Sequence, residues 1–401
     1  MTKKSDTPAI RFKGFTDTWE QRKVGDLLIE RNQQAPMSDE YPLMAFIANE
    51  GVAPKGERYD RSALVTDTVN KLYKKTEKGD FIYSSNNLET GSIGLNKYGK
   101  ACISPVYSIF EPTGIADSDF LGRRLVRKDF INAMVKWRQG VIYGQWRIHE
   151  SDFLKIEITV PSVEEQRKIG AYLDQLDNLI TLHQRKYDKL TNVKKSMLEK
   201  MFPKNGSNVP EIRFKGFTEA WEQRKAKELF VSTADKGYPE LPVLSATQDR
   251  GMIRRDENSI NIFHDKKNEA GYKRVLPGQF VIHLRSFQGG FAHSTIEGIT
   301  SPAYTVFGFS EPEKHDSEYW KYVFTSKSFI RRLETVTYGI RDGRSISYEE
   351  FLTLGFVYPS KAEQTAIARY LDKLSDLITL HQRDLEKLKN IKKSCLENMF
   401  V

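Results

Sequence analysis

The nearest approach to a catalytic motif is a glycine and lysine pattern at residues 94–101, which reads Gly-Leu-Asn-Lys-Tyr-Gly-Lys-Ala. A phosphate-binding loop uses similar spacing, because its backbone amides cradle phosphates and a final Ser or Thr hydroxyl binds magnesium. Here the last position is Ala101, which has no hydroxyl, and the residues after it favour a strand instead of a phosphate-facing helix. The segment therefore predicts a hairpin turn and not a nucleotide site.

Other catalytic classes are excluded by the spacing of histidine, glycine, proline and cysteine. The seven histidines form no H-E-x-x-H or H-x-E motif, and no two glycines stand two residues apart, which removes the dinucleotide fingerprint. No proline follows an asparagine or aspartate, so the N-P-P-[FY] or D-P-P-Y tetrapeptide of amino-methyltransferases is also missing. Cys102 and Cys395 have no C-x-x-C spacing, so a disulfide scaffold or cysteine-rich zinc site is excluded. The sequence offers no catalytic constellation.

The elements that would position functional residues come from an internal repeat. IRFKGFTDTWEQRK at residues 10–23 returns as IRFKGFTEAWEQRK at 212–225, with 12 of 14 positions identical. A second block at 164–203 returns at 362–401, with 24 of 40 positions identical. The chain is therefore two copies of a unit of roughly 200 residues, joined by the turn-rich linker PKNGSNVPE.

Between these blocks the two copies agree only at scattered glycine, proline and aromatic positions. Each central region reads as short β-rich runs, then a charged helix with an apolar stripe, at 117–139 and 314–337, then a closing strand, KIEITV or LGFVYP. We expect an α+β fold class with two similar mixed α/β domains that share one fold and differ in surface.

Each unit is expected to close with a long helix. Ser162 with Glu165, and Ser360 with Glu363, have capping-box spacing directly after a proline. An apolar seam with heptad spacing then runs from 169 to 190 and from 367 to 388, which is typical of a coiled coil. A helix of about 36 residues is about 54 Å long and cannot bury its stripe in one small domain. We expect the two helices to pair with each other, antiparallel, and to separate the domains.

Two histidines, His183 and His381, occupy equivalent positions in this seam. We interpret them as polar residues that fix the pairing register. A metal or catalytic role stays open as the alternative, although the sequence shows no second ligand set.

Repetition of the unit also predicts the topology. The linker holds residue 202 near residue 212, so equivalence of the units places residue 400 near residue 10. The molecule should be pseudo-twofold and pseudo-cyclic. The expected domains are 1–161, the first domain; 162–203, the first spacer helix; 204–359, the second domain; and 360–401, the second spacer helix.

The chain of 401 residues carries 62 Lys+Arg and 53 Asp+Glu, a net charge of +9, which makes nucleic-acid binding plausible. The central segments 24–161 and 226–359 are each neutral, so the excess lies in the repeated blocks. No apolar run approaches the length of a membrane span, and no secretory signal is present at the N-terminus. We expect a cytoplasmic protein without a membrane partner.

Two like domains on a fixed spacer suit the reading of two short DNA elements at a set distance. The whole chain resembles the specificity subunit of type I restriction-modification systems. The carrying residues are FKGFTDTWEQRK and FKGFTEAWEQRK, and the P-S-x-x-E-Q-x-x-I-x-x-Y-L-D start of each long helix, at 161–174 and 359–372.

The resemblance implies two target recognition domains that read an asymmetric bipartite site in double-stranded DNA. It implies a non-catalytic chain that recruits two methyltransferase subunits and restriction/translocase subunits, which together methylate adenine and cleave DNA. No cofactor is expected in this chain, and S-adenosylmethionine, ATP and magnesium are expected on the partner subunits. The repeated blocks would then dock the two identical partners, through Arg185, Arg383, Trp19 and Trp221.

Base-reading candidates are polar and cationic side chains on loops between strands, because Arg pairs with guanine and Asn or Gln with adenine. In the first domain they are Asn86, Asn87, Tyr143, Gln145 and Arg147. In the second they are Arg285, Ser286, Gln288, Arg341 and Arg344. Two alternatives stay open: a stand-alone DNA-modifying enzyme, and a duplicated scaffold that binds only protein.

Overall fold

A computed structural model describes residues 7–54, 71–142, 145–204, 207–247, 250–257, 266–283, 290–333, 337–338 and 345–401. The chain divides into two compact units. The first comprises Met1–Gln184 and Arg383–Val401, and the second is the continuous stretch Arg185–Gln382. Each long helix is therefore shared between the units, whereas the domains expected from sequence order kept each helix whole.

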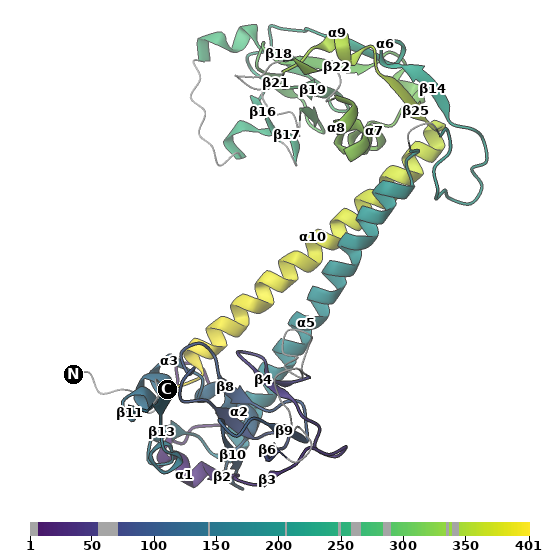
Figure 1. Cartoon of the computed structure of the whole chain (residues 1–401). Coiled ribbons are helices and arrows are strands. Elements are labelled where there is room, and N and C mark those ends of the chain that lie inside the picture. The colour runs from purple at the N-terminus through teal and green to yellow at the C-terminus, as the bar shows by residue number, and fades with distance from the viewer. Residues whose placement is uncertain are drawn as a thin grey trace. The chain divides into compact units, whose positions relative to one another are not determined.

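The body of the first unit consists of short strands and short helices (Figure 1). Its elements are β1 (Glu20–Lys23), α1 (Val24–Leu27), β2 (Leu28–Glu30), β3 (Gln34–Ala35), β4 (Ala45–Ile47), β5 (Gly51–Ala53), β6 (Tyr73–Thr76), β7 (Phe81–Tyr83), β8 (Ile93–Leu95), β9 (Ala101–Ile103), β10 (Ser108–Pro112), α2 (Ser118–Arg124), α3 (Lys128–Val135), β11 (Gln139–Ile142), β12 (Gln145–Arg147), α4 (Glu150–Phe153) and β13 (Glu157–Val160). The long helix α5 (Val163–Lys200) follows.

The body of the second unit has the same plan. Its elements are β14 (Glu222–Lys225), α6 (Ala226–Leu229), β15 (Phe230–Thr233), β16 (Leu244–Thr247), β17 (Gly251–Arg254), η3 (Arg255–Glu257), η4 (Lys266–Gly271), β18 (Lys273–Val275), β19 (Phe280–Ile282), β20 (Phe291–His293), β21 (Gly298–Thr300), β22 (Thr305–Phe309), η5 (Pro312–Lys314), α7 (Ser317–Thr325), α8 (Lys327–Leu333), β23 (Thr337–Tyr338), β24 (Ser345–Ile346), α9 (Tyr348–Phe351) and β25 (Gly355–Tyr358). The second long helix is α10 (Lys361–Asn398).

Strand order confirms that the two domains share one fold. The main antiparallel sheet runs β2-β10-β7-β8 in the first unit and β15-β22-β19-β20 in the second. Phenylalanines at matching places form both cores: Phe110 and Phe153 lie 4.6 Å apart between ring centroids, and Phe307 and Phe351 lie 5.3 Å apart. The α+β class, with two mixed domains and two long helices, is as expected.

Two local expectations were wrong. The Gly94–Ala101 turn does not form a hairpin, because β8 pairs with β7 and β9 pairs with β6, in different sheets. The single helix expected at 314–337 is two helices, α7 and α8. The break falls at Ser326, whose hydroxyl accepts a hydrogen bond from the Phe329 amide at 3.2 Å and so caps the next helix. The region 117–139 is also two helices, α2 and α3, and the residue before α3, Arg127, makes no side-chain capping bond.

The long helices pair antiparallel within each unit. In the first unit, Leu388 and Cys395 of α10 pack in one core with Leu173 and Leu176 of α5. Lys392 Nζ lies 2.5 Å from a carboxylate oxygen of Asp177, so positions late in α10 lie beside positions early in α5. In the second unit the end of α5 packs in the same way beside the start of α10.

The start of each repeat lies beside the end of a long helix. The Ile10 amide donates a hydrogen bond to the Asn398 carbonyl at 2.9 Å, and the Ile212 amide donates to the Lys200 carbonyl at 3.0 Å. These two contacts are equivalent in the repeat, as the pseudo-cyclic prediction required. No helix in the described part of the chain is long and apolar enough to cross a membrane.

Candidate nucleic-acid interface

An arginine and a buried glutamate anchor the start of each long helix. Arg11 donates two hydrogen bonds to Glu165, at 2.8 and 2.7 Å, and Arg213 donates two to Glu363 at the same distances. The glutamate side chains are 1% and 2% exposed. The hydrogen bond raises the pKa of Arg11 above its usual value. A fork of this kind fixes orientation as well as charge, so it joins the first residues of each repeat to its spacer helix.

The expected capping box is only half of this arrangement. The Glu165 amide lies 3.4 Å from the Ser162 hydroxyl, as a cap requires, but the Glu165 carboxylate accepts its bonds from Arg11. Arg11 and Glu165 are 154 positions apart in the sequence. Local spacing therefore identified the right residue and assigned it the wrong partner.

The glutamine after each of these glutamates ties the helix to its domain. The side-chain oxygen of Gln166 accepts from the Asp117 amide at 3.0 Å, and its nitrogen donates to the Pro161 carbonyl at 2.9 Å. Gln364 makes the equivalent bonds to Asp316 and Pro359, each at 2.9 Å. These four partners lie at the N-terminal ends of α2 and α7 and before the long helices. The Glu-Gln pair, identical in both repeats, was the sequence signal for this junction.

In the first domain the loop between β7 and β8 lies against the β11–β12 hairpin. Arg138, just before β11, donates to both carboxylate oxygens of Glu89, at 3.0 and 2.7 Å, and to the Ser85 carbonyl at 3.1 Å. The Ser85 hydroxyl in turn accepts from the Ile148 amide at 3.0 Å. Two of the segments chosen from sequence are thus one surface.

The base-reading candidates of the first domain lie on these two segments. Asn86 is half-buried and Asn87 is exposed, both in the loop after β7. Arg147 is 67% exposed at the end of β12, and its guanidinium lies 3.9 Å from Glu150. Gln145 begins β12. Tyr143 lies outside the described residues.

All five candidates of the second domain, Arg285, Ser286, Gln288, Arg341 and Arg344, lie outside the described residues. Their places in the sequence can still be compared with those of the first-domain candidates. Segment 284–289 joins β19 to β20, as the Asn86 loop joins β7 to β8, and residues 341 and 344 stand between β23 and β24, which match β11 and β12. Equivalent connections were therefore chosen in both domains.

The docking candidates separate into two groups. Arg185 and Arg383 are exposed on the long helices. Trp19 and Trp221 are buried, 4% and 3% exposed, and pack inside the two domain cores. Burial argues against the docking role expected for these tryptophans, because a partner cannot reach a side chain enclosed in the core of this structure. Leu182 and Leu380, at equivalent positions three residues before the arginines, are 47% and 40% exposed.

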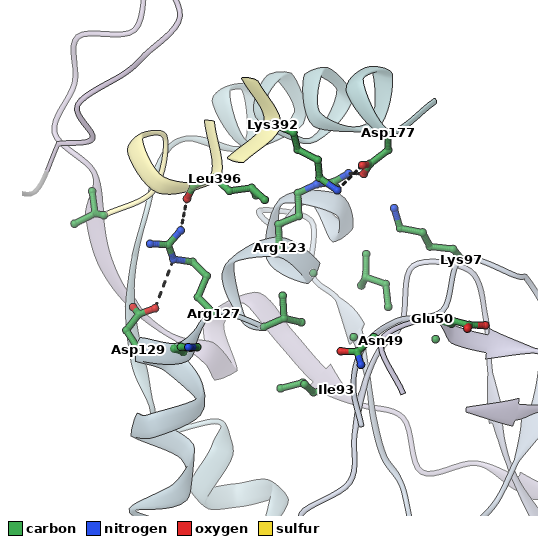
Figure 2. Close-up of a pocket in the computed structure, with 17 residues that line it drawn as sticks. Asn49, Glu50, Ile93, Lys97, Arg123, Arg127, Asp129, Asp177, Lys392 and Leu396 are labelled. Atoms are coloured by element: carbon green, nitrogen blue, oxygen red, sulfur yellow. Dashed lines mark hydrogen bonds and ion pairs between the residues drawn. The ribbon is translucent and has the colours of Figure 1, made fainter. Parts of the chain in front are cut away.

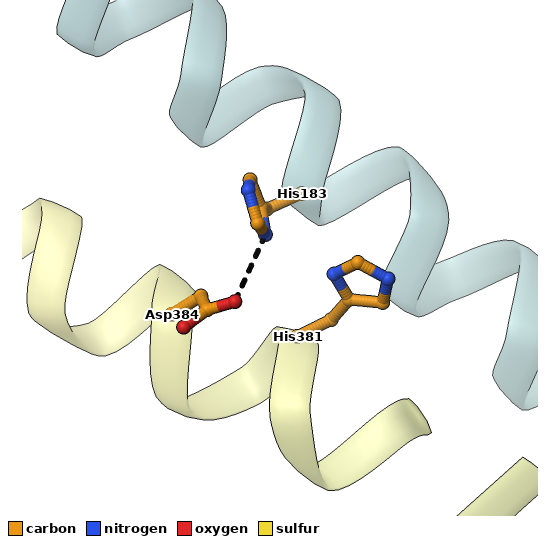
Figure 3. A group of neighbouring side chains, drawn as sticks. All are labelled: His183, His381 and Asp384. Carbon is orange, nitrogen blue, oxygen red and sulfur yellow. Dashed lines mark ion pairs between the residues drawn. The ribbon is translucent and has the colours of Figure 1, made fainter. Parts of the chain in front are cut away.

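The seam histidine of the first unit makes a polar contact between the helices. Figure 3 shows His183 of α5 directed toward Asp384 of α10, with Nδ1 and a carboxylate oxygen 3.8 Å apart. Its sequence equivalent, His381, belongs to the second unit. A polar contact between the two long helices at this position is what the register interpretation expects.

The first unit contains a cavity of about 1020 Å³ where α10 meets the domain body (Figure 2). Three of the cationic side chains that line it have partners within the chain. Arg123 donates to Asp177 at 3.1 Å, Arg127 donates to the Leu396 carbonyl, and Lys392 lies 2.5 Å from Asp177. Burial raises the pKa of nearby Asp174, but hydrogen bonds from Arg123 and Lys97 outweigh it and hold that pKa below its usual value.

The comparisons with known proteins all find similarity to the same class of protein. Residues 16–192 match the family model described as type I restriction modification DNA specificity domain. The type I restriction enzyme MjaVIII specificity subunit of Methanocaldococcus jannaschii is 24% identical over 95% of this chain and 91% of its own length. A putative type I restriction enzyme MjaX specificity subunit of the same organism is 20% identical over 63% of this chain and 60% of its own length.

Among solved structures, the S subunit of a type I restriction-modification system from M. genitalium has a similar fold. Its crystal structure superposes with a TM-score of 0.55 and 12% sequence identity, and the match covers 98% of this chain and 99% of that one.

Proposed function

We propose that the chain, which resembles the type I restriction-modification specificity subunits, is the subunit that reads DNA sequence through two target recognition domains. One observation carries the proposal: the same strand order presents equivalent connections in both domains, while the residues in those connections differ. A shared fold with different loops reads two different half-sites. The target would therefore be an asymmetric bipartite sequence in double-stranded DNA.

The chain would supply specificity and leave the chemistry to its partners. Its sequence has none of the methyltransferase, nucleotide or metal-hydrolase motifs considered above. Adenine methylation and DNA cleavage would then belong to methyltransferase and restriction/translocase subunits, which would hold S-adenosylmethionine, ATP and magnesium. Arg123, Arg127 and Lys392, which line the cavity of the first unit, are paired within the chain, in keeping with this division.

Docking of two identical methyltransferase subunits would use the repeated segments. LITLHQR occurs at 179–185 and again at 377–383, and its exposed members include Leu182 with Arg185, and Leu380 with Arg383. An exposed leucine beside an exposed arginine at equivalent places on both long helices suits two copies of one partner.

The test is methylation of a random-sequence DNA library by the chain assembled with a type I methyltransferase subunit, mapped base by base. We expect methylation at one split, asymmetric sequence. Exchange of residues 24–161 for the matching segment of another specificity subunit should change one half of that sequence and leave the other half intact. An assembled complex with no sequence preference, and no salt-dependent DNA affinity, would instead identify a protein scaffold.

A further inference from the structure

Three segments of the first domain meet at the Arg138 guanidinium. It holds the loop after β7 through Glu89 and the Ser85 carbonyl, as described above. It also lies 6.0 Å from the ring centroid of Trp146 in β12. The Arg138 side chain is 12% exposed, whereas Glu89 is 55% exposed. One largely buried cation therefore fixes the position of an exposed loop relative to an exposed indole.

The exposure of Trp146 is unusual within this chain. Of the five tryptophans, Trp19, Trp221 and Trp320 are 4%, 3% and 0% exposed. Trp146 is 44% exposed and Trp137 is 38% exposed. Trp137, just after α3, lies with its ring 6.0 Å from Lys155 Nζ, whereas Trp146 stands in the hairpin beside the loop that carries Asn86 and Asn87. An exposed indole costs hydration free energy, which a partner surface would recover.

The surroundings of Trp146 match a nucleic-acid groove. A two-stranded β-ribbon fits the major groove of B-DNA, and β11–β12 is such a ribbon. Arg147, next in the strand, is 67% exposed, and its ion pair with Glu150 is long, at 3.9 Å, so it can reach phosphate or a base edge. Successive strand side chains point to opposite faces, so Trp146 faces the loop side and Arg147 the other.

We propose that Trp146 is a specificity-determining residue of the first target recognition domain, contacting base edges of the first half-site, and that Arg138 is the residue that positions it against the loop of Asn86 and Asn87. This inference rests on the proposed function and assigns residues within it. An apolar ring discriminates most strongly at the thymine methyl group. The loss of Trp146 should therefore relax one or two neighbouring base pairs and leave the rest of the site unchanged.

The first experiment compares Trp146→Ala with Trp137→Ala, a second exposed tryptophan of the same domain, in the chain assembled with a methyltransferase subunit. Methylation of a random library gives the preference at every position. We expect Trp146→Ala to lower discrimination about 10- to 100-fold at one or two adjacent positions of the first half-site. Trp137→Ala should keep the wild-type pattern. Unchanged preference in an assembled Trp146→Ala complex would overturn the assignment.

Two further variants keep the test decisive. Trp146→Phe retains an apolar ring and should fold if the alanine variant does not; it should retain most of the discrimination. Arg138→Gln removes the fork to Glu89 and should relax the same positions as Trp146→Ala, which a loss of stability alone would not do. A pattern spread evenly over both half-sites would remove Arg138 from the proposed role.

Fluorescence gives a second readout, independent of methylation. In a Trp137→Phe variant, the tryptophans other than Trp146 are buried. DNA that contains the wild-type site should then protect Trp146 from quenching by acrylamide. If the wild-type complex methylates one split site and Trp146 stays fully quenchable, this inference fails alone. If the wild-type complex shows no split site, the proposed function fails first.

Discussion

The backbone amide of Ile10 donates a hydrogen bond to the backbone carbonyl of Asn398 at 2.9 Å. The same bond recurs between Ile212 and Lys200 at 3.0 Å. In the second case a short linker brings the residues together, whereas in the first most of the sequence separates Ile10 from Asn398. The contact at Ile10 therefore comes from the fold itself, and the linker at 203–211 is dispensable as a source of proximity.

A circular permutant tests this conclusion. Joining residue 401 to residue 8 and opening the chain within 203–211 should give a folded protein, because the new link spans residues that are already adjacent and the new ends lie on an exposed turn. Circular dichroism and thermal unfolding measure the result. A permutant opened between Phe81 and Ile82, both buried in β7, should fail to fold. Equal failure of both permutants would contradict the pseudo-cyclic arrangement.

The Arg11–Glu165 pair should be a large contributor to stability. Arg11→Ala leaves a carboxylate that is 1% exposed without its partner, and should lower the free energy of unfolding by about 3 kcal/mol. Arg11→Lys keeps the charge but loses the two parallel hydrogen bonds, so its free energy of unfolding should lie between those of the wild type and Arg11→Ala. Urea denaturation measures both.

Arg22→Ala is the matched control for that prediction. Arg22 pairs with Glu20 on the surface, with the two side chains 40% and 67% exposed, so its loss should cost less than about 1 kcal/mol. Similar losses for Arg11→Ala and Arg22→Ala would show that burial does not decide the strength of these pairs.

His315 should make the second unit sensitive to acid. Burial lowers the pKa of His315 to about 4, and its ring stacks on Phe309 with centroids 4.7 Å apart. The unfolded chain, with a histidine pKa near about 6.5, takes up the proton first as the pH falls. The stabilisation is complete above that pH and is lost between about 6.5 and 4, a change of about 3 kcal/mol.

His315→Phe should remove this part of the pH dependence, since a phenyl ring cannot bind a proton. Denaturation curves at pH 7.5 and pH 4.5 give the difference between variant and wild type. Exposed His149, replaced by Gln, should leave the wild-type dependence in place. The interpretation would be wrong if His315→Phe lost as much stability on acidification as the wild type.

Partner docking should depend on the exposed members of the helix repeats. Leu182→Asp combined with Leu380→Asp places charge on apolar surface, and should weaken assembly with a methyltransferase subunit by about 10-fold or more. Size-exclusion chromatography or calorimetry measures the affinity. Charge reversal of Arg185 and Arg383 should weaken it as well. Assembly that is unchanged by both pairs of substitutions would place docking elsewhere.

Trp19 provides the contrast between core and surface. Its ring is 4% exposed and meets Phe120 edge-on, with centroids 5.8 Å apart. Trp19→Ala should lower the free energy of unfolding by about 3 to 5 kcal/mol. At low temperature, where the variant is still folded, its affinity for the methyltransferase subunit should equal that of the wild type. Weaker binding by the folded variant would restore the docking role that burial argues against.

Much of the fold could be predicted from the sequence, because each structural signal occurs in both copies of the repeat. Two copies of one pattern predicted the long helices, their pairing and the adjacency of Ile10 to Asn398. The strand KIEITV matches β13, Glu157–Val160, since alternating apolar residues report a half-buried strand. The same reasoning misjudged residues 94–101, because a turn signal does not say which strands pair across it.

The candidate site was less predictable because its contacts are distant in sequence. Arg138 and Glu89 carry no local signature, and neither does the fork from Arg11 to Glu165. Tryptophan raised a different difficulty: Trp19 and Trp146 have the same chemistry, and only the fold decides that one is core and the other surface. Loop positions such as Asn86 could be identified from strand order alone, and their function still depends on the DNA tests.

The division of the chain into units also sets an order of events during synthesis on the ribosome. The second unit, Arg185–Gln382, is continuous and can complete its core once those residues have emerged. The first unit needs Cys395, Met399 and Phe400 from the last turns of α10. The domain translated first is therefore the domain finished last, and a premature stop near the end of the message would damage the first domain while sparing the one encoded beside it.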